Sequence, residues 1–171
     1  MKTAKRYPFL RLLNERFRLH MENASSFSDL PSEKQFRLWA WQAVKTAYRH
    51  AEIGLVLLDE NEARAYNRDY RSKDYATNVL SFAFNEGELL PEQDDGVLRG
   101  DIVICPQVVA REAAEQGKNL EAHFAHLTVH GVLHLMGYDH MEDGEAEEME
   151  ALEIRLLNQL AYANPYAQDE I

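Results

Sequence analysis

The chain has 171 residues, of which 46% are hydrophobic and 27% are charged, a length and balance that favour a globular protein and exclude a disordered or fibrous one. A single cysteine excludes a disulfide framework and fits a reducing compartment, the cytoplasm. No apolar run in the sequence approaches the ~20 residues of a membrane-spanning helix, so we expect a soluble protein.

The net charge of −11 is unevenly distributed along the chain. Residues 1–50 carry ten Lys and Arg against four Asp and Glu, whereas residues 112–171 carry two against thirteen. A basic half can contact phosphates while the acidic half faces solvent, so the negative total does not exclude an RNA partner.

The N-terminal third of the chain predicts an extension, a strand and a helix. Residues 1–15 are a basic extension that is too often interrupted by polar residues to be a signal-peptide core. Residues 17–22 alternate apolar and polar side chains, as a half-buried strand does. Pro31 and Ser32 can start a helix, and apolar side chains then recur at helical spacing as far as Tyr48.

The middle of the chain predicts two strands, a helix and a polar loop. Residues 53–58 are a short apolar run, typical of a central strand. Asp59 can cap the helix predicted over residues 60–70, and a polar loop follows as far as Asn78. Residues 79–84 alternate and are rich in aromatic side chains, which favours a strand.

The second half of the chain is mainly helical. A long exposed connection over residues 85–99 leads to a strand at residues 100–105. Three helices follow, at residues 107–116, 120–136 and 144–161.

These elements predict the fold class. Helices and strands alternate only in part, which indicates an α+β or mixed α/β domain with one twisted sheet of three or four strands, covered by about five helices. No repeat or domain boundary is visible, so residues 16–171 are expected to form one domain after the extension of residues 1–15. The helix at residues 120–136 is apolar around its histidines and is expected in the core.

Three histidines near the end of that helix have the spacing of a metal site. His130 and His134 lie on one face of a helix, one turn apart. Gly137 can end the helix in a left-handed conformation, so that the chain folds back and delivers His140 to the same point. Three nitrogen ligands with a fourth position open to water are typical of catalytic zinc, and Cys105 alone cannot build a thiolate cage. The sequence therefore predicts one zinc ion per chain.

A histidine pair on a helix can also be a packed pair without a metal. The third histidine, after a glycine, reproduces the HxxxHxxGxxH spacing of the metzincin zinc proteases, which favours a metal. Those proteases carry a glutamate as general base directly after the first histidine, and here this position is Gly131. This chain therefore lacks the proton-transfer group that a peptidase of that class needs.

Other polar residues near the motif have plainer interpretations. His123 and His126 lie one to two turns before it and could assist proton transfer, but histidines with structural partners are the better interpretation. Asp139 could accept a hydrogen bond from the free N–H of a ligand. The acidic run of residues 142–153 is interpreted as a solvated helix face, because it lacks the pattern of a calcium loop.

Three segments carry a further signal. They are YRSKD (70–74) followed by TNVLSF (77–82), then GDIVI (100–104), and finally HGVLHLMGYDH (130–140) preceded by HFAHLTV (123–129). In this order they resemble the YbeY family of bacterial rRNA maturation factors, which are metal-dependent endoribonucleases. The resemblance extends from about residue 17 to the C-terminus, so residues 16–171 would form one metal-dependent hydrolase domain.

The resemblance implies a function that composition and spacing do not show. It implies a single-strand-specific, zinc-dependent endoribonuclease that matures the 3′ end of 16S rRNA and acts in ribosome quality control. The implied partners are rRNA, the small ribosomal subunit, a small-subunit ribosomal protein and an assembly GTPase, with no DNA and no membrane. His130, His134 and His140 would be zinc ligands and Arg71 an essential RNA contact, so Arg71, His130 and His134 are the expected catalytic residues.

The loop that contains Arg71 and Lys73 suits an RNA phosphate. The planar guanidinium of Arg71 can bind phosphate through two hydrogen bonds, and the ammonium of Lys73 adds a point charge. A solvated loop held by Asp69 and Asp74 explains the same residues equally well, and the resemblance favours substrate binding by Arg71 and Lys73. Two other functions stay open: a zinc metallopeptidase, and a non-catalytic ribosome-assembly factor with a structural metal.

Overall fold

Four strands form one mixed sheet in the order β1-β2-β4-β3 within residues 16–84, 96–139 and 141–167, the part of the chain that the computed structural model describes. The strands are β1 (Phe17–Asn23), β2 (His50–Leu57), β3 (Val79–Ala83) and β4 (Val97–Ile104). β1, β2 and β4 run parallel, and β3 pairs antiparallel with β4 at one edge. The predicted central strand, β2, is therefore an inner strand of the sheet.

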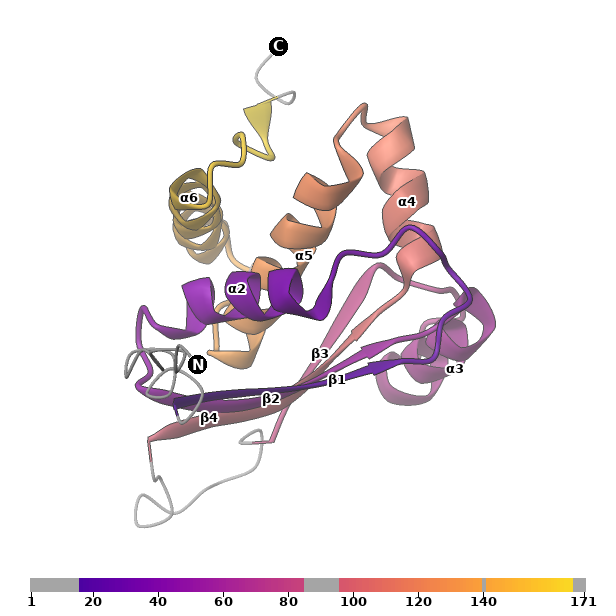
Figure 1. Cartoon of the computed structure of the whole chain (residues 1–171), viewed down its shortest axis with the longest axis horizontal. Coiled ribbons are helices and arrows are strands. Elements are labelled where there is room, and N and C mark those ends of the chain that lie inside the picture. Colours follow the sequence, from indigo (N-terminus) through magenta and orange to yellow (C-terminus); the bar gives the residue numbers. More distant parts are fainter. Residues whose placement is uncertain (1–15, 85–95, 140, 168–171) are drawn as a thin grey trace, which may run out of the picture.

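The described residues also form five helices. They are α2 (Glu33–Val44), α3 (Glu60–Arg71), α4 (Pro106–Glu115), α5 (Leu120–Leu135) and α6 (Asp143–Gln159). Figure 1 shows α2 and α5 on one face of the sheet and α3 on the other, and α6 packs against α5. The larger hydrophobic core includes residues of the sheet, α2, α5 and α6, and a smaller core includes residues of α3 and the opposite face. The predicted α+β fold, with the histidine-bearing helix in the core, is confirmed.

Local capping signals set the starts of two helices. Ser32 accepts a hydrogen bond from the backbone N–H of Gln35, and the Gln35 side chain accepts one from the backbone N–H of Ser32. These reciprocal bonds form a capping box at the start of α2. Asn119 accepts from the backbone N–H of Ala122 at the start of α5, as its position in the sequence predicts.

The side chain of Asp59, expected to cap α3, makes no capping hydrogen bond although the residue stands at the N-cap position. Its carboxylate accepts from the hydroxyl of Ser25 at 2.7 Å and from the side-chain amide of Gln107 at 2.5 Å. Ser26 donates both its backbone N–H and its hydroxyl to the same carboxylate. These hydrogen bonds hold the pKa of Asp59 below its usual range. The prediction was wrong because distant partners compete with the local cap.

β4 begins at Val97, earlier than the strand predicted at residues 100–105, because its first residues pair with the start of β2. Gly100 therefore lies inside the strand. A Cβ at Gly100 would meet the backbone oxygen of Phe82 at 2.8 Å and the side chain of Leu135 at 2.6 Å. A glycine in a sequence often marks a turn. Gly100 instead lies within β4, where the absence of a side chain lets β3 and α5 approach closely.

Gly131 lies where α5 packs against β3 and β4. A Cβ at this position would stand 3.2 Å from Cγ2 of Val79, and 3.3 Å from Cγ2 of Ile102 and from Oγ of Ser81. The position that carries the general base in metzincin proteases is therefore part of a buried helix–sheet contact in this fold.

Gly131→Glu is expected to lower the free energy of unfolding by about 3 kcal/mol or more, because it forces a carboxylate into a buried and closely packed contact. For a chain of this length the melting temperature should fall by roughly 10 °C, which thermal unfolding followed by circular dichroism measures. Gly144→Glu is the matched control, since a Cβ at Gly144 meets open space, and its melting temperature should change by less than about 2 °C. Equal melting temperatures for the two variants would contradict the packing role of Gly131.

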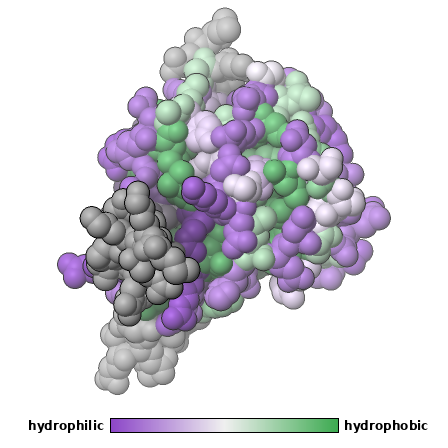
Figure 2. Space-filling model, in the orientation of Figure 1, coloured by the Kyte–Doolittle hydropathy of each residue, from purple (hydrophilic) through white to green (hydrophobic). Residues whose placement is uncertain are grey.

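The face of the molecule seen in Figure 2 carries many hydrophilic side chains around small groups of hydrophobic ones. Among the described residues no helix is long and apolar enough to cross a membrane. The predicted extension, residues 1–15, and residues 85–95 of the predicted connection lie outside the described part of the chain.

Candidate metal centre and adjoining cleft

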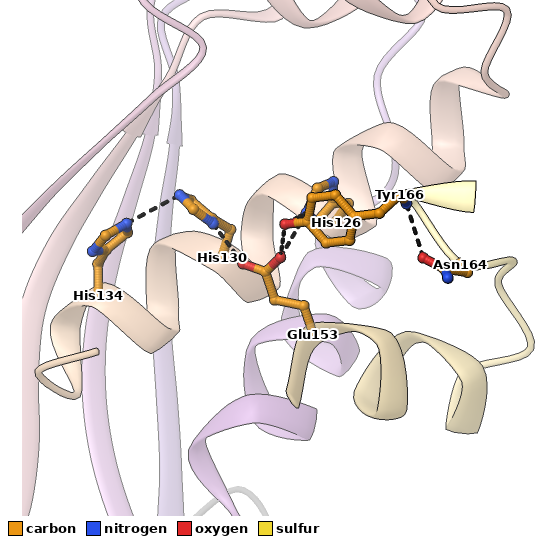
Figure 3. A network of polar contacts seen from close by, with 6 residues as sticks. All are labelled: His126, His130, His134, Glu153, Asn164 and Tyr166. Atoms are coloured by element: carbon orange, nitrogen blue, oxygen red, sulfur yellow. Dashed lines mark hydrogen bonds and ion pairs between the residues drawn. The ribbon is translucent and has the colours of Figure 1, made fainter. Parts of the chain in front are cut away.

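His130 and His134 lie one turn apart on α5, and their rings point toward each other (Figure 3). Their Nε2 atoms are 3.0 Å apart and their ring centroids 4.5 Å apart. Two histidine ligands of a tetrahedral zinc ion, with Zn–N bonds of about 2.0–2.1 Å, have nitrogens roughly 3.3 Å apart. The pair therefore fits a single ion after a small adjustment.

Glu153 of α6 sets the orientation of His130. Its Oε1 accepts a hydrogen bond from Nδ1 of His130 at 2.5 Å. Because a carboxylate only accepts, Nδ1 carries a proton, and Nε2 points toward His134. Metal-binding histidines usually have such an acceptor on the other ring nitrogen. The contact therefore prepares His130 to bind a cation through Nε2.

Glu153 has a side chain that is 0% exposed. Its Oε2 accepts hydrogen bonds from Nε2 of His126, at 3.0 Å, and from the hydroxyl of Tyr166. Burial alone would raise the pKa of Glu153, but the hydrogen bonds from His126 and His130 outweigh burial and lower the pKa to about 2. The interpretation of residues 142–153 as a solvated face was wrong for this residue, because its side chain turns into the core.

His126, His130 and Glu153 offer ligand atoms that lie within 4.8 Å of one another, so this group is a possible metal site. Burial lowers the pKa of His126, although the hydrogen bond that its Nε2 donates to Glu153 acts to raise it. An ion bound by all three residues would displace the hydrogen bonds of Glu153. An ion between His130 and His134 would leave those hydrogen bonds in place.

His123 lies further along the same helix, and its Nε2 is 2.9 Å from Oε2 of Glu112. The side-chain amide of Asn78 donates to both oxygens of that carboxylate at 3.1 Å. The Nδ1 atoms of His123 and His126 are buried and have no hydrogen-bond partner among the described residues. Each of these two histidines thus has a carboxylate partner, which agrees with the structural interpretation of both.

His140, the third predicted ligand, lies outside the described residues. The chain before it turns as predicted: Gly137 has a φ of +97°, in the left-handed region, and the N–H of Tyr138 donates to the carbonyl of Leu133. Asp139 lines the cleft described next. The turn after α5 therefore brings the chain to the site at the residue before His140.

A cleft of about 600 Å³ lies beside the histidine pair. Its walls come from the end of α3, the loop before β3, β3 itself, and the end of α5 with the turn after it. The lining residues that the sequence singled out are Arg71, Lys73, His130, His134 and Asp139. Segments far apart in the sequence meet here, so the cationic loop and the histidine pair share one cleft.

Arg71 is the last residue of α3, and two contacts hold its guanidinium. Its Nη2 donates to the carbonyl of Ser81 at 2.8 Å, and its central carbon lies 5.7 Å from the ring centroid of Phe82. A guanidinium has five N–H donors, so the bond to Ser81 leaves donors for a ligand. Arg71 is thus positioned by β3 while it lines the cleft.

The acids near this loop pair with other arginines. Asp74 accepts two hydrogen bonds from Arg64, at 2.8 and 2.9 Å, and Asp69 accepts one from its neighbour Arg68 at 3.1 Å. Asp74 thus ties the loop to α3 through Arg64, and both acids pair with arginines other than Arg71. These exposed pairs contribute little to stability, but they offset carboxylate charge close to the cleft.

Ser81 connects Arg71 to α5, the helix that carries the histidine pair. Its hydroxyl donates to the carbonyl of Gly131 at 2.8 Å, and its own carbonyl accepts from Arg71. Two hydrogen bonds therefore join Arg71 to the residue that follows His130, and they hold the two sides of the cleft together.

Glu153 and Tyr166 are site residues that sequence reasoning missed. A signal for Glu153 existed, because it stands four residues after Met149 and three before Leu156, on the buried stripe of α6, where a charge is unexpected. Tyr166 follows α6 in a segment without periodicity, so only the tertiary structure places its hydroxyl beside His126 and Glu153.

Glu153→Ala is expected to weaken zinc binding roughly 10- to 100-fold, the usual effect of removing the acceptor behind a metal-binding histidine. Glu153→Gln keeps an acceptor oxygen for His130 and should have an intermediate affinity. Competition with a chromophoric chelator measures both values. Unchanged affinity in Glu153→Ala would contradict the orienting role, and complete loss of zinc in Glu153→Gln would identify Glu153 as a ligand.

The fold and the site together define a class of protein, an α+β domain in which a histidine pair lies beside a cleft lined by Arg71 and Lys73. The sequence profile of the family described as Endoribonuclease YbeY matches residues 20–161. The chain belongs to this family, so the resemblance inferred from its three segments is confirmed.

Curated relatives support this membership over nearly the whole chain. Endoribonuclease YbeY of Neisseria meningitidis serogroup C is 66% identical over 170 residues, covering 99% of each chain. The protein of that name from Chromobacterium violaceum is 49% identical over 172 residues and covers all of both chains. The one from Pseudomonas fluorescens is 52% identical and covers 89% of this chain and 97% of its own. The first two relatives therefore also match the basic extension.

A solved structure supports the fold. The solution structure of TM1509 from Thermotoga maritima superposes with a TM-score of 0.55 at 26% identity, covering 84% of this chain and 88% of that chain.

Proposed function

We propose that this protein is a zinc-dependent endoribonuclease that cuts single-stranded RNA. Family membership supports a hydrolase that acts on RNA. The observation that supports a zinc-dependent mechanism is the cleft that Arg71, Lys73, His130 and His134 share. Phosphodiester hydrolysis needs a nucleophile and neutralisation of the negative charge on the transition state. A histidine metal pair beside two cations is suited to both tasks.

The proposed zinc ligands are His130, His134 and His140. Three histidines with an open fourth position are typical of catalytic zinc, and the Nε2 atoms of the first two lie at a distance that suits one ion. When bound, zinc supplies Lewis-acid chemistry, which favours attack by water near neutral pH and polarises a phosphoryl oxygen. Glu153 keeps the proton on Nδ1 of His130, so this ring presents Nε2.

Arg71 is proposed to bind the scissile phosphate. Its planar fork can form two charge-assisted hydrogen bonds with phosphate oxygens. Because Ser81 and Phe82 already hold the guanidinium, Arg71 loses little conformational freedom when the substrate binds. Lys73 lines the same cleft and is proposed to contribute a second, less directional positive charge to the RNA backbone.

Two rival functions are less well supported. A zinc metallopeptidase would need a general base after the first histidine, and Gly131 occupies that position inside a helix–sheet contact. An assembly factor with a structural metal would use Arg71 and Lys73 to bind RNA, but it would have no need of a histidine pair that lines the same cleft.

A single assay separates the three functions. The purified protein, with its zinc content measured by mass spectrometry, is incubated with a single-stranded rRNA fragment and with a peptide library, each with and without chelator. We expect RNA cleavage that chelator abolishes and added zinc restores, with no peptide cleavage. Zinc-dependent peptide cleavage would favour the peptidase, and stoichiometric zinc without any cleavage would favour the assembly factor.

The biological role proposed for this chain follows from its family resemblance. The substrate would be the 3′ end of 16S rRNA in the cytoplasm, with a further role in ribosome quality control. The partners would be the small subunit, one of its ribosomal proteins and an assembly GTPase. Residues 16–171 would form the hydrolase domain and residues 1–15 a basic extension. Depletion of the protein should lead to accumulation of small-subunit rRNA with an unprocessed 3′ end, which primer-based mapping of that end detects.

A further inference from the structure

Three aromatic side chains gather on α3 and β3, next to the cleft. Tyr66 and Tyr70, one turn apart on α3, stack with ring centroids 5.7 Å apart and planes inclined by 28°. Phe82 of β3 contacts Tyr70 edge-to-face at 5.4 Å and lies tilted against Tyr66 at 6.5 Å. Tyr66, Tyr70 and Phe82 are called the aromatic cluster below.

The two tyrosines of the aromatic cluster are exposed. Tyr70 is 67% exposed and Tyr66 41%, so packing in the core does not explain their presence. Tyr75, which is 53% exposed, lines the cleft beside them. Neighbouring exposed aromatic side chains on a soluble domain commonly mark a binding surface. The location beside the cleft indicates that this surface serves the same ligand.

The aromatic cluster is directly connected to the arginine of the cleft. The guanidinium of Arg71 lies over the ring of Phe82 at 5.7 Å, and Arg71 follows Tyr70 in the chain. The nearby carboxylates of Asp69 and Asp74 form ion pairs with arginines of α3, which reduces their repulsion of a polyanion. Flat rings beside cations match a ligand that carries both flat rings and negative charge.

We propose that the aromatic cluster is a stacking platform for unpaired nucleobases of the RNA substrate, next to the phosphate that Arg71 binds. This inference rests on the proposed function and deepens it. Stacking on aromatic side chains holds single strands with little regard to sequence. Bases of a duplex stack on one another and are not available to such a platform. The platform would therefore supply the preference for single-stranded RNA.

The test distinguishes binding through the bases of the RNA from binding through its phosphates. The full-length, zinc-loaded protein is titrated by fluorescence anisotropy with a labelled, unstructured RNA of roughly 12 nucleotides, a length that single-strand grooves can span. A second RNA has the same backbone but carries abasic ribose at its central positions. Both RNAs carry phosphorothioate linkages that slow hydrolysis, and gel analysis after each titration verifies that the RNA is intact.

We expect Tyr70→Ala to bind the intact RNA about tenfold more weakly than wild type, the loss typical of one stacked base. Both proteins should bind the abasic RNA equally, because its phosphates are unchanged. Tyr70→Phe should keep wild-type affinity for the intact RNA, whereas Tyr70→Leu should not. Leu38→Ala is the control, since Leu38 is an exposed apolar residue on α2, and it should bind like wild type.

Wild-type affinity of Tyr70→Ala for the intact RNA would overturn the platform and would be the result if the cluster served a protein partner instead. An equal loss on both RNAs would also overturn it, because the tyrosine would then act by positioning Arg71. In either case RNA binding by wild type would leave the proposed function intact. Failure of wild type to bind any of these RNAs would contradict the proposed function itself.

Discussion

His134→Ala is expected to retain no stoichiometric zinc and to cleave RNA on the order of a thousandfold or more slowly than wild type, because metal-supplied chemistry provides the nucleophile and charge stabilisation. The pair formed by His130 and His134 is the described part of the proposed site, and the loss of one of three ligands leaves too few for tight binding. Metal content by mass spectrometry and single-turnover cleavage of one RNA measure the two effects.

The same variant should melt at a lower temperature than the zinc-loaded wild type. A metal present at a hundredfold excess over its dissociation constant stabilises the folded state by about 2.7 kcal/mol, which corresponds to roughly 5–10 °C for a chain of this length. His20→Ala is the control, because His20 is exposed on β1, away from the cleft. Full zinc occupancy in His134→Ala would show that the ligands are misassigned.

Arg71→Ala should lower the rate of cleavage about a hundredfold or more and leave zinc content unchanged. Removal of a charge-assisted contact to a transition-state phosphate costs a few kcal/mol, and a guanidinium has no lone pair with which to bind a metal. The melting temperature should fall by only a few degrees, because Arg71 is exposed and loses one hydrogen bond to Ser81. Single-turnover rates, metal content and thermal unfolding test the three statements.

Two further variants separate the charge of Arg71 from its geometry. Arg71→Lys should recover only part of the lost rate, since an ammonium keeps the charge but not the bidentate fork. Arg18→Ala is the control, because it removes an exposed arginine of β1 that pairs with Glu52 and does not line the cleft. RNA affinity should depend less steeply on salt in Arg71→Ala than in wild type. Wild-type cleavage and salt dependence in Arg71→Ala would assign Arg71 a structural role.

Much of the fold was predictable because the relevant signals act over a few residues. Ser32 and Asn119 stand at the starts of helices and cap them, and Gly137 ends α5 in the left-handed conformation that the sequence predicts. The spacing of His130 and His134 determines their distance, because four residues in a helix always place side chains one turn apart. The main local error, the start of β4, arose because pairing with a distant strand extended it.

The surroundings of the histidine pair depend on contacts between residues far apart in the chain. Glu153 reaches His130 from another helix, and Arg71 takes its place in the cleft through the carbonyl of Ser81. Asp59 likewise binds partners from other segments instead of its own helix. Periodicity determines which face of a helix is buried, but not which side chain of another element meets that face. The residue types needed for a metal site and a phosphate site were therefore visible in the sequence. Their meeting in one cleft was decided only when α3, β3, α5 and α6 packed together.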